Sequence, residues 1–189
     1  CLSISLTGAN LLHHWAFDEA SGSSVADSVG SANILIDGSS TGWTNGKYGG
    51  AFTFDGSNYA RTPTNDSVTN PSASVAIAGW FKTSNNVAAV STLFQIENKY
   101  GMQISSGGKL QLSFDRIGSV GGAPQWGDPI DDGLWHHFVA QNNGTTTELY
   151  IDGVSVGSRA ETLSSLANQS RASVVGARLN NSLPFEGTI

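Results

Sequence analysis

Apolar and polar side chains alternate along many short stretches of this chain. The alternation is strict in Leu110–Phe114 and looser in Leu11–Phe17 and Ser74–Lys82, and no stretch keeps the 3.6-residue period of an amphipathic helix. Because successive side chains of a strand point to opposite faces of a sheet, each stretch predicts a strand with one buried face. Shorter runs predict further strands at residues 34–36, 50–54, 93–96, 102–104 and 173–176.

The stretch Leu134–Gly153 predicts a β-hairpin. Two alternating segments flank Asn143-Gly144, and Asp152-Gly153 closes the second segment. Both dipeptides favour the tight turns that join antiparallel strands. We expect Trp135 and Tyr150, on the two paired strands, to pack as large half-buried side chains that support the fold.

So many short strands need a second layer to cover their apolar faces. The sequence therefore predicts an all-β fold, a two-sheet antiparallel β-sandwich, in one domain covering residues 1–189, a length that suits a single core. Residues 1–9 are interpreted as an N-terminal extension or as the remnant of a processed signal. The only helical candidate, residues 161–168, is interpreted as a loop or a single turn.

Several blocks, in their order and spacing, resemble the laminin-G-like domains of the concanavalin A-like lectin/glucanase family. The blocks are His14–Gly22, Gly46–Gly56, Ala78–Lys82 and the Trp-His-His hairpin at 135–153. The resemblance implies that the sandwich is a jelly roll. Phe185–Ile189 resembles only the start of the family's final strand, so we expect a truncated strand that leaves one sheet edge uncertain.

Composition favours an extracellular or cell-surface protein. Only 13% of residues are charged and 23 are glycine, a make-up typical of turns and short strands. The net charge of -6 and the nine scattered Lys and Arg residues argue against nucleic acid as a partner. No apolar run approaches the roughly 20 residues that a membrane span needs.

Cys1 is the only cysteine, which excludes an intrachain disulfide. Two interpretations of its position are open. Cys1 is either the acylated residue of a lipoprotein, which would anchor the protein through lipid, or the boundary of a trimmed chain.

The sequence predicts no catalytic residues, and we expect the protein not to be an enzyme. Glycosidases need two carboxylates across the scissile bond. Glu148 and Asp152 share a strand face with Tyr150, but Asp152 is expected to form a turn and Glu148 to face outward.

The histidine pairs 13–14 and 136–137 are expected to be structural. Adjacent strand residues point to opposite faces, so neither pair can converge on one metal ion. We expect one of His136 and His137 to pack against Trp135 or Trp80 and the other to be exposed.

A long non-periodic segment, Arg116–Asp132, is the first candidate for a ligand site, since loops of this length usually have a function. An aromatic face and planar polar groups suit sugar recognition. The candidate ligand-binding residues are Trp126, Asp128, Arg116 and Gln125. The alternative is that Trp126 folds back as a plug on the core. Trp43, with Asn45, is a second candidate, and its alternative is packing against the Gly-rich turn.

Calcium enters through the resemblance alone. Jelly-roll domains of this kind often bind one structural Ca²⁺ through loop carboxylates and backbone carbonyls. The resemblance points to Asp18, Asp27 and Asp55 as metal ligands. The alternative is that these aspartates only form turns.

The resulting hypothesis is a non-catalytic glycan-binding or adhesion module whose partner is a carbohydrate or glycoprotein, with a neutral or weakly charged glycan as ligand. The alternative is a structural or assembly module of a surface layer, fibre or virion that contacts other copies or neighbouring protein domains. A polysaccharide lyase or glycosidase ranks third. Fold alone does not separate these classes.

Overall fold

The computed structural model describes residues 1–5, 11–63, 74–84, 90–96, 100–114, 124–162, 172–178 and 182–189. These residues form seventeen strands. They are β1 (Leu2–Ser5), β2 (Leu11–Trp15), β3 (Ser24–Val25), β4 (Ile34–Asp37), β5 (Trp43–Asn45), β6 (Gly50–Asp55), β7 (Tyr59–Arg61), β8 (Val75–Lys82), β9 (Ser91–Ile96), β10 (Tyr100–Ile104), β11 (Leu110–Phe114), β12 (Gln125–Trp126), β13 (Trp135–Asn142), β14 (Thr146–Ile151), β15 (Val154–Ala160), β16 (Ser173–Val175) and β17 (Glu186–Thr188). The described ranges contain no helix with the length and hydrophobicity to cross a membrane.

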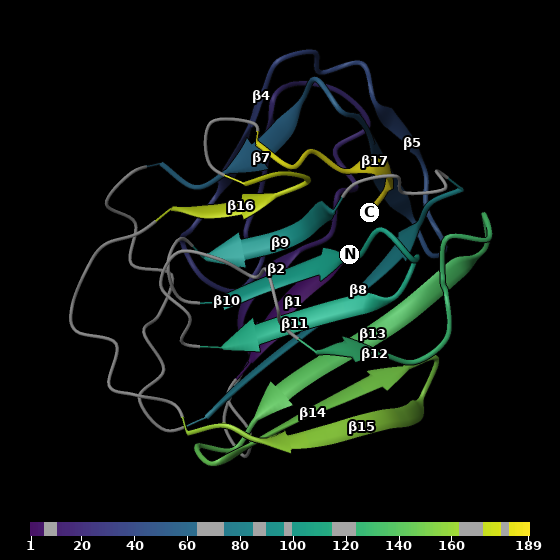
Figure 1. The fold of residues 1–189 in the computed structure, drawn as a ribbon. Coiled ribbons are helices and arrows are strands. Elements are labelled where there is room, and N and C mark those ends of the chain that lie inside the picture. The colour runs from purple at the N-terminus through teal and green to yellow at the C-terminus, as the bar shows by residue number, and fades with distance from the viewer. Residues whose placement is uncertain are drawn as a thin grey trace.

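The strands form two antiparallel sheets that pack as layers (Figure 1). The nine-stranded sheet runs β15-β14-β13-β8-β17-β6-β5, with β1 and β2 joined to it through β8, and the eight-stranded sheet runs β12-β11-β10-β9-β16-β7-β4-β3. This confirms the predicted two-sheet antiparallel β-sandwich.

Strand β8 lies at the centre of the nine-stranded sheet. One edge pairs with β13 along its whole length, while the other is shared by β1, which places Leu2 opposite Gly79, and by β17, which places Thr188 opposite Lys82. The marked N- and C-terminal ends therefore lie side by side (Figure 1). β17 lies between β6 and β8, so it forms no sheet edge.

The strand β1 was not predicted. Its segment is only four residues long, at the lower limit for recognising an alternating pattern. Leu2 is nevertheless 1% exposed and belongs to the core. Pairing with both β2 and β8 explains how so short a segment is held.

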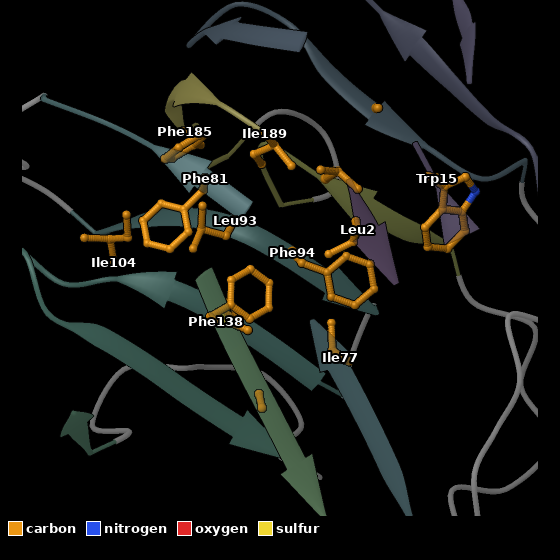
Figure 2. Close-up of a cluster of buried hydrophobic side chains, with 14 of the residues drawn as sticks. Leu2, Trp15, Ile77, Phe81, Leu93, Phe94, Ile104, Phe138, Phe185 and Ile189 are labelled. Carbon is orange, nitrogen blue, oxygen red and sulfur yellow. The ribbon is translucent and has the colours of Figure 1, made fainter. Parts of the chain in front are cut away.

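The core fills the space between the two sheets (Figure 2). The alternation predicted for β8 and β13 holds, because Ile77, Phe81 and Phe138 point inward and are at most 2% exposed. Trp15 from β2 and Phe94 from the opposite sheet complete the same cluster. The side chains of the other parity on β8 and β13 are left on the outer face of the nine-stranded sheet.

The predicted hairpin is confirmed. β13 and β14 flank the turn at Asn143-Gly144, and Asp152 and Gly153 both have positive φ, at 51° and 81°. Two positive φ angles in succession are typical of a type I′ turn, which joins antiparallel strands tightly. Here the turn leads directly into β15, an edge strand that the sequence analysis did not predict.

Candidate binding site

Trp126 does not offer a surface for ligand stacking. It lies in β12 opposite Leu110, is 8% exposed and belongs to the hydrophobic core. Its ring packs against Gly157, where a Cβ would collide with the indole. The Trp126 side chain is therefore part of the hydrophobic core, which was one of the two alternatives for this residue.

The polar residues predicted to bind a sugar together with Trp126 therefore have no exposed indole beside them. Gln125 and Asp128 are exposed, and Arg116 lies outside the described residues. The hypothesis of a sugar site in this segment depended on an accessible indole. The burial of that indole leaves the segment without an aromatic face that a sugar could contact.

Trp43, the second candidate, is half-buried on β5. Its Nε1 donates to the carbonyl of Gly22 at 2.9 Å, and its ring meets Phe52 edge-on at 5.2 Å. With Asn45 and Asp18 it lines a hollow of about 340 Å³. The structure thus brings together one predicted ligand-binding residue and one predicted metal ligand, although the contacts of the indole are those of a packing residue.

Asp27 has a structural role that its hydrogen bonds define. Its side chain is fully buried and accepts the backbone N–H groups of His14, Val29, Gly30 and Ala32 at 2.9–3.2 Å, while His13 Nδ1 lies 2.6 Å away. Burial favours the neutral acid, but the hydrogen bonds outweigh it and hold the pKa of Asp27 far below its usual range. Both carboxylate oxygens are occupied, which leaves no lone pair directed at a metal ion.

The predicted calcium ligands do not converge. Asp55 accepts the backbone N–H and the hydroxyl of Ser57 at 2.9 and 2.7 Å, bonds that form a local turn and lower its pKa. Asp18 accepts the N–H of Gly50. No group of three or more His, Cys, Asp or Glu side chains in the described ranges could hold a metal. The set Asp18, Asp27 and Asp55 does not fit a calcium site, and calcium itself stays a prediction.

Two tryptophans lie on the outer face of the nine-stranded sheet. Because Phe81 and Phe138 point into the core, Trp80 on β8 and Trp135 on β13 project from the other side, and both are half-buried. Trp80 lies opposite His137, with ring centroids 5.0 Å apart. Trp135 was expected to support the sandwich; it is half-buried as predicted, but it lies outside the core.

The turn between β5 and β6 carries two more side chains to this face. Gly46 donates its N–H to the carbonyl of Gly49 at 2.8 Å, and Gly49 has a φ of 67°, which a glycine adopts without strain. This tight turn presents Lys47 and Tyr48. Tyr48 is 72% exposed, and its ring meets Trp80 edge-on at 5.6 Å.

Two hollows open beside these rings, and we call them together the outer-face site. The smaller, about 100 Å³, is lined by Cys1, Gly46, Lys47, Tyr48, Gly50, Ala51, Trp80, Trp135 and Ile189. The larger, about 600 Å³, is lined by Thr53, Lys82, Thr83, Ser84, Gly133, Glu186, Gly187 and Thr188. Lys82 joins the two, because it lines the larger hollow while its Nζ lies 5.8 Å from the centroid of the Trp135 ring.

The outer-face site combines two kinds of surface. The smaller hollow has aromatic walls, and the larger has hydroxyl groups with one ammonium and one carboxylate. Sugars present C–H faces that pack on aromatic rings and hydroxyl groups that need hydrogen-bond partners. An oligosaccharide is therefore a ligand whose chemistry matches both halves of the site.

The histidines have the structural roles that the strand geometry predicted. His13 stacks on Trp15 at 5.5 Å and contacts Asp27, and His137 packs against Trp80. Burial lowers the pKa of His137, so its ring is neutral at pH 7. One histidine of the pair 136–137 was expected to be exposed, but His136, the one that does not pack on Trp80, is half-buried.

His136 joins two turns. Its Nδ1 lies 2.8 Å from Asp152 Oδ2, and its Nε2 lies 3.1 Å from Asp132 Oδ1. Burial opposes the charged ring, but these two carboxylates outweigh it and raise the pKa of His136. A ring with an acceptor at each nitrogen is satisfied fully only when it is protonated.

We expect the contacts of His136 with Asp132 and Asp152 to make the free energy of unfolding depend on pH. Because the pKa of His136 is higher in the folded state than its ordinary value of 6.5, its contribution is complete below pH 6.5 and is lost as pH rises through the raised pKa. Urea unfolding of the wild type and of His136→Gln at pH 5.5, 7 and 8.5 measures this. The stability difference should shrink as pH rises, and a difference that grows would contradict the assignment.

Glu148 on the second hairpin strand and Asp152 directly after it are both held by hydrogen bonds. Glu148 accepts hydrogen bonds from Gln141 Nε2 at 2.6 Å and from the Tyr150 hydroxyl at 3.2 Å. Asp152 is bound to His136 and to the backbone N–H of His137. Each group is engaged in packing the hairpin and its turns.

Sequence reasoning missed Tyr48, Trp80, Lys47 and Lys82 as site residues. A signal existed for Trp80, because it shares its parity with Ala76 and Ala78, and a large aromatic among small residues on one strand face suggests an exposed platform. The same parity places Lys82 on that face, two positions after Trp80 on the same strand. No signal existed for Lys47 and Tyr48, because their meeting with Trp80 depends on the pairing of β6, β17 and β8, which are far apart in the sequence.

Comparison with protein families finds one match over most of the chain. The laminin-G-type model of the concanavalin A-like lectin/glucanases superfamily matches residues 54–189. Comparison with curated proteins finds no significant relative.

Solved structures share the fold at low sequence identity. Domain 4 of AbnA, a GH43 extracellular arabinanase from Geobacillus stearothermophilus in complex with arabinotriose, has a TM-score of 0.71 and 19% identity, over 98% of this chain and 89% of that one. Domains LG4-5 of the mouse laminin α1 chain give 0.54 and 22%, over 72% and 38%. Botulinum neurotoxin type C, whose cell entry depends on two ganglioside molecules, gives 0.57 and 13%, over 84% and 43%. This chain thus spans less than half of the last two.

Proposed function

Because this chain belongs to the concanavalin A-like lectin/glucanases superfamily, we propose that it is a non-catalytic glycan-binding module of a secreted or surface-attached protein. We propose further that the glycan binds at the outer-face site. The observation that carries this proposal is the meeting of Tyr48, Trp80 and Trp135 around one hollow, directly beside a second hollow lined by hydroxyl groups.

The arrangement of the rings supports the proposal. Trp80 and Trp135 stand on adjacent strands of a rigid sheet, and the burial of Phe81 and Phe138 behind them fixes their positions. A site on packed strands needs little ordering when the ligand binds, which lowers the entropic cost of association. Tyr48, on a tight turn, adds an exposed ring at the margin.

The structural neighbours support carbohydrate as the class of partner. The arabinanase domain is bound to arabinotriose, and cell entry of the neurotoxin depends on gangliosides. The arabinanase is extracellular, which agrees with an extracellular or cell-surface location for this chain. Lipid attachment at Cys1 stays a prediction.

Removing an aromatic wall of the smaller hollow should weaken glycan binding. A glycan array identifies a ligand, and titration calorimetry then measures its dissociation constant. Tyr48→Ala and Trp80→Ala should each weaken binding at least about tenfold, which corresponds to about 1.4 kcal/mol. Tyr48 is so exposed that its removal leaves the fold unaffected, so its effect reports binding alone.

Tyr59→Ala is the matched control, because Tyr59 is a half-buried aromatic residue of β7 in the opposite sheet. Its affinity should equal that of the wild type. Equal affinity of all three variants would place the glycan elsewhere. Release of reducing or unsaturated sugar ends by the wild type would show an enzyme instead.

An assembly role is the second candidate. β15 is a seven-residue edge strand, and Val154 at its start is 66% exposed. Unpaired edges can add a strand from another chain. This role would be favoured if the protein bound no glycan on the array and showed concentration-dependent self-association in sedimentation.

A further inference from the structure

The outer-face site has a charge that differs from that of the whole chain. The chain carries a net charge of -6, yet two lysines border the aromatic walls. Lys47 Nζ lies 5.6 Å from the centroid of the Trp80 ring, and Lys82 Nζ lies 5.8 Å from that of Trp135. Both lysines are exposed.

Within the part of the chain that the structure describes, neither ammonium group forms an ion pair with a carboxylate. Other cations of the described ranges form ion pairs, as Arg61 does with Asp37 and Arg159 with Glu161, but no ion pair of Lys47 or Lys82 occurs there. The ring contacts hold each ammonium group only weakly, because cation–π interactions at exposed sites are weak. The two lysines are thus oriented by the indoles and still available to an anion.

The negative charge at the site is limited. Glu186 lines the larger hollow and opposes an anion there, while the smaller hollow is lined by Lys47 and no acidic residue. The neighbouring His137 is neutral at pH 7. The side chains that line the smaller hollow, beside the two tryptophan rings, therefore carry the positive charge of Lys47 and no carboxylate. A carboxylate does lie close by, since Asp18 accepts the N–H of the lining residue Gly50.

We propose that the ligand of the outer-face site is an acidic glycan, whose carboxylate or sulfate groups are bound by Lys47 and Lys82 while its sugar rings pack on Trp80 and Trp135. This inference rests on the proposed function and names its ligand class. It replaces the neutral or weakly charged glycan that the overall charge suggested. Ammonium–carboxylate and ammonium–sulfate contacts are charge-assisted and stronger than neutral hydrogen bonds.

The test uses pairs of oligosaccharides that differ only in charge. The carboxylate pair is trigalacturonic acid and its methyl ester, and the sulfate pair is a chondroitin sulfate tetrasaccharide and its desulfated form. Calorimetry on the full chain should show tighter binding of the acidic member in one pair or both. The pair in which the acidic member gains more affinity over the neutral one identifies whether the site binds carboxylate or sulfate. Raising the salt from about 0.05 M to about 0.5 M should reduce the preference.

Charge-removing variants assign the preference to the two lysines. Lys47→Gln and Lys82→Gln should each weaken binding of the acidic oligosaccharide about fivefold, the range of a partly exposed ion pair. Each should weaken binding of the matched neutral oligosaccharide by a smaller factor, because both side chains also line the site. Lys109→Gln is the control, because it removes the same charge from the turn between β10 and β11 of the opposite sheet. It should leave both affinities unchanged.

The outcomes separate this inference from the proposed function. If the acidic and neutral members of each pair bind with equal affinity, and Trp80→Ala removes the binding of both, the acidic ligand is overturned. The proposed glycan binding at the outer-face site then stands. A variant that carries both Lys47→Gln and Lys82→Gln should lose the preference for the acidic member. If this variant keeps the preference, the assignment to Lys47 and Lys82 is overturned. Failure to bind any oligosaccharide, neutral or acidic, would overturn both.

Discussion

Asp27→Ala should destabilise the protein by about 3–5 kcal/mol, in the range of mutations that break a buried hydrogen-bond network around a charged group. The carboxylate accepts four backbone N–H groups and lies 2.6 Å from His13 Nδ1. Alanine would leave these buried donors without their acceptor, and each such loss costs free energy. The bonds join β2 to residues 27–32, so the variant should also loosen that connection.

Urea unfolding at pH 7 measures the effect, and Asp37→Asn is the matched control. Asp37 pairs with Arg61, but its side chain is 34% exposed. Surface pairs of this kind contribute about 0–1 kcal/mol. An Asp27→Ala variant as stable as the control would show that Asp27 is not the structural residue that its contacts describe.

The stabilising effect of Asp27 should also depend on pH. Its pKa is lowered on folding, so its contribution is fully present above the ordinary value of 3.8 and is lost as pH falls through the folded value. The stability difference between wild type and Asp27→Ala should therefore be constant from pH 5 to 7 and shrink only in strong acid.

Phe138→Ala and Trp135→Ala should differ sharply, although the two residues lie on the same strand. Phe138 is 2% exposed in the core between the sheets, and its truncation should cost about 3–5 kcal/mol through lost burial and a cavity. Trp135 lies half-buried on the outer face, and its loss should cost only about 1–2 kcal/mol. Denaturant titration of both variants gives the comparison.

The two variants also separate stability from binding. Trp135→Ala should remain folded and lose affinity for the glycan, because its ring lines the smaller hollow. Phe138→Ala, measured where it is still folded, should keep its affinity. A larger loss of stability for Trp135→Ala than for Phe138→Ala would mean that the faces of β13 are assigned the wrong way round.

Much of the fold was predictable, because strand periodicity and turn residues act locally. The alternation around Phe81 and Phe138, and the turn at Asp152-Gly153, were identified from short windows of sequence. β1 was not predicted because its strand conformation depends on pairing with β2 and β8. No local sequence pattern encodes that pairing.

The site was less predictable for the same reason. Trp126 stands in a polar, Gly-rich segment that is typical of an exposed loop, but Gly157 on a distant strand provides the space that buries its ring. The meeting of Tyr48 with Trp80 likewise depends on β17 inserting between β6 and β8. Contacts between distant segments decided which aromatic residues face solvent.

The indole N–H signals of the five tryptophans provide the most direct test of where the glycan binds. Each gives a separate peak in a ¹⁵N–¹H correlation spectrum, and titration with a bound oligosaccharide should move those of Trp80 and Trp135. The peaks of Trp15 and Trp126, whose rings are buried in the core, should stay in place. Movement of the Trp43 or Trp126 peak while those of Trp80 and Trp135 remain fixed would contradict the outer-face site.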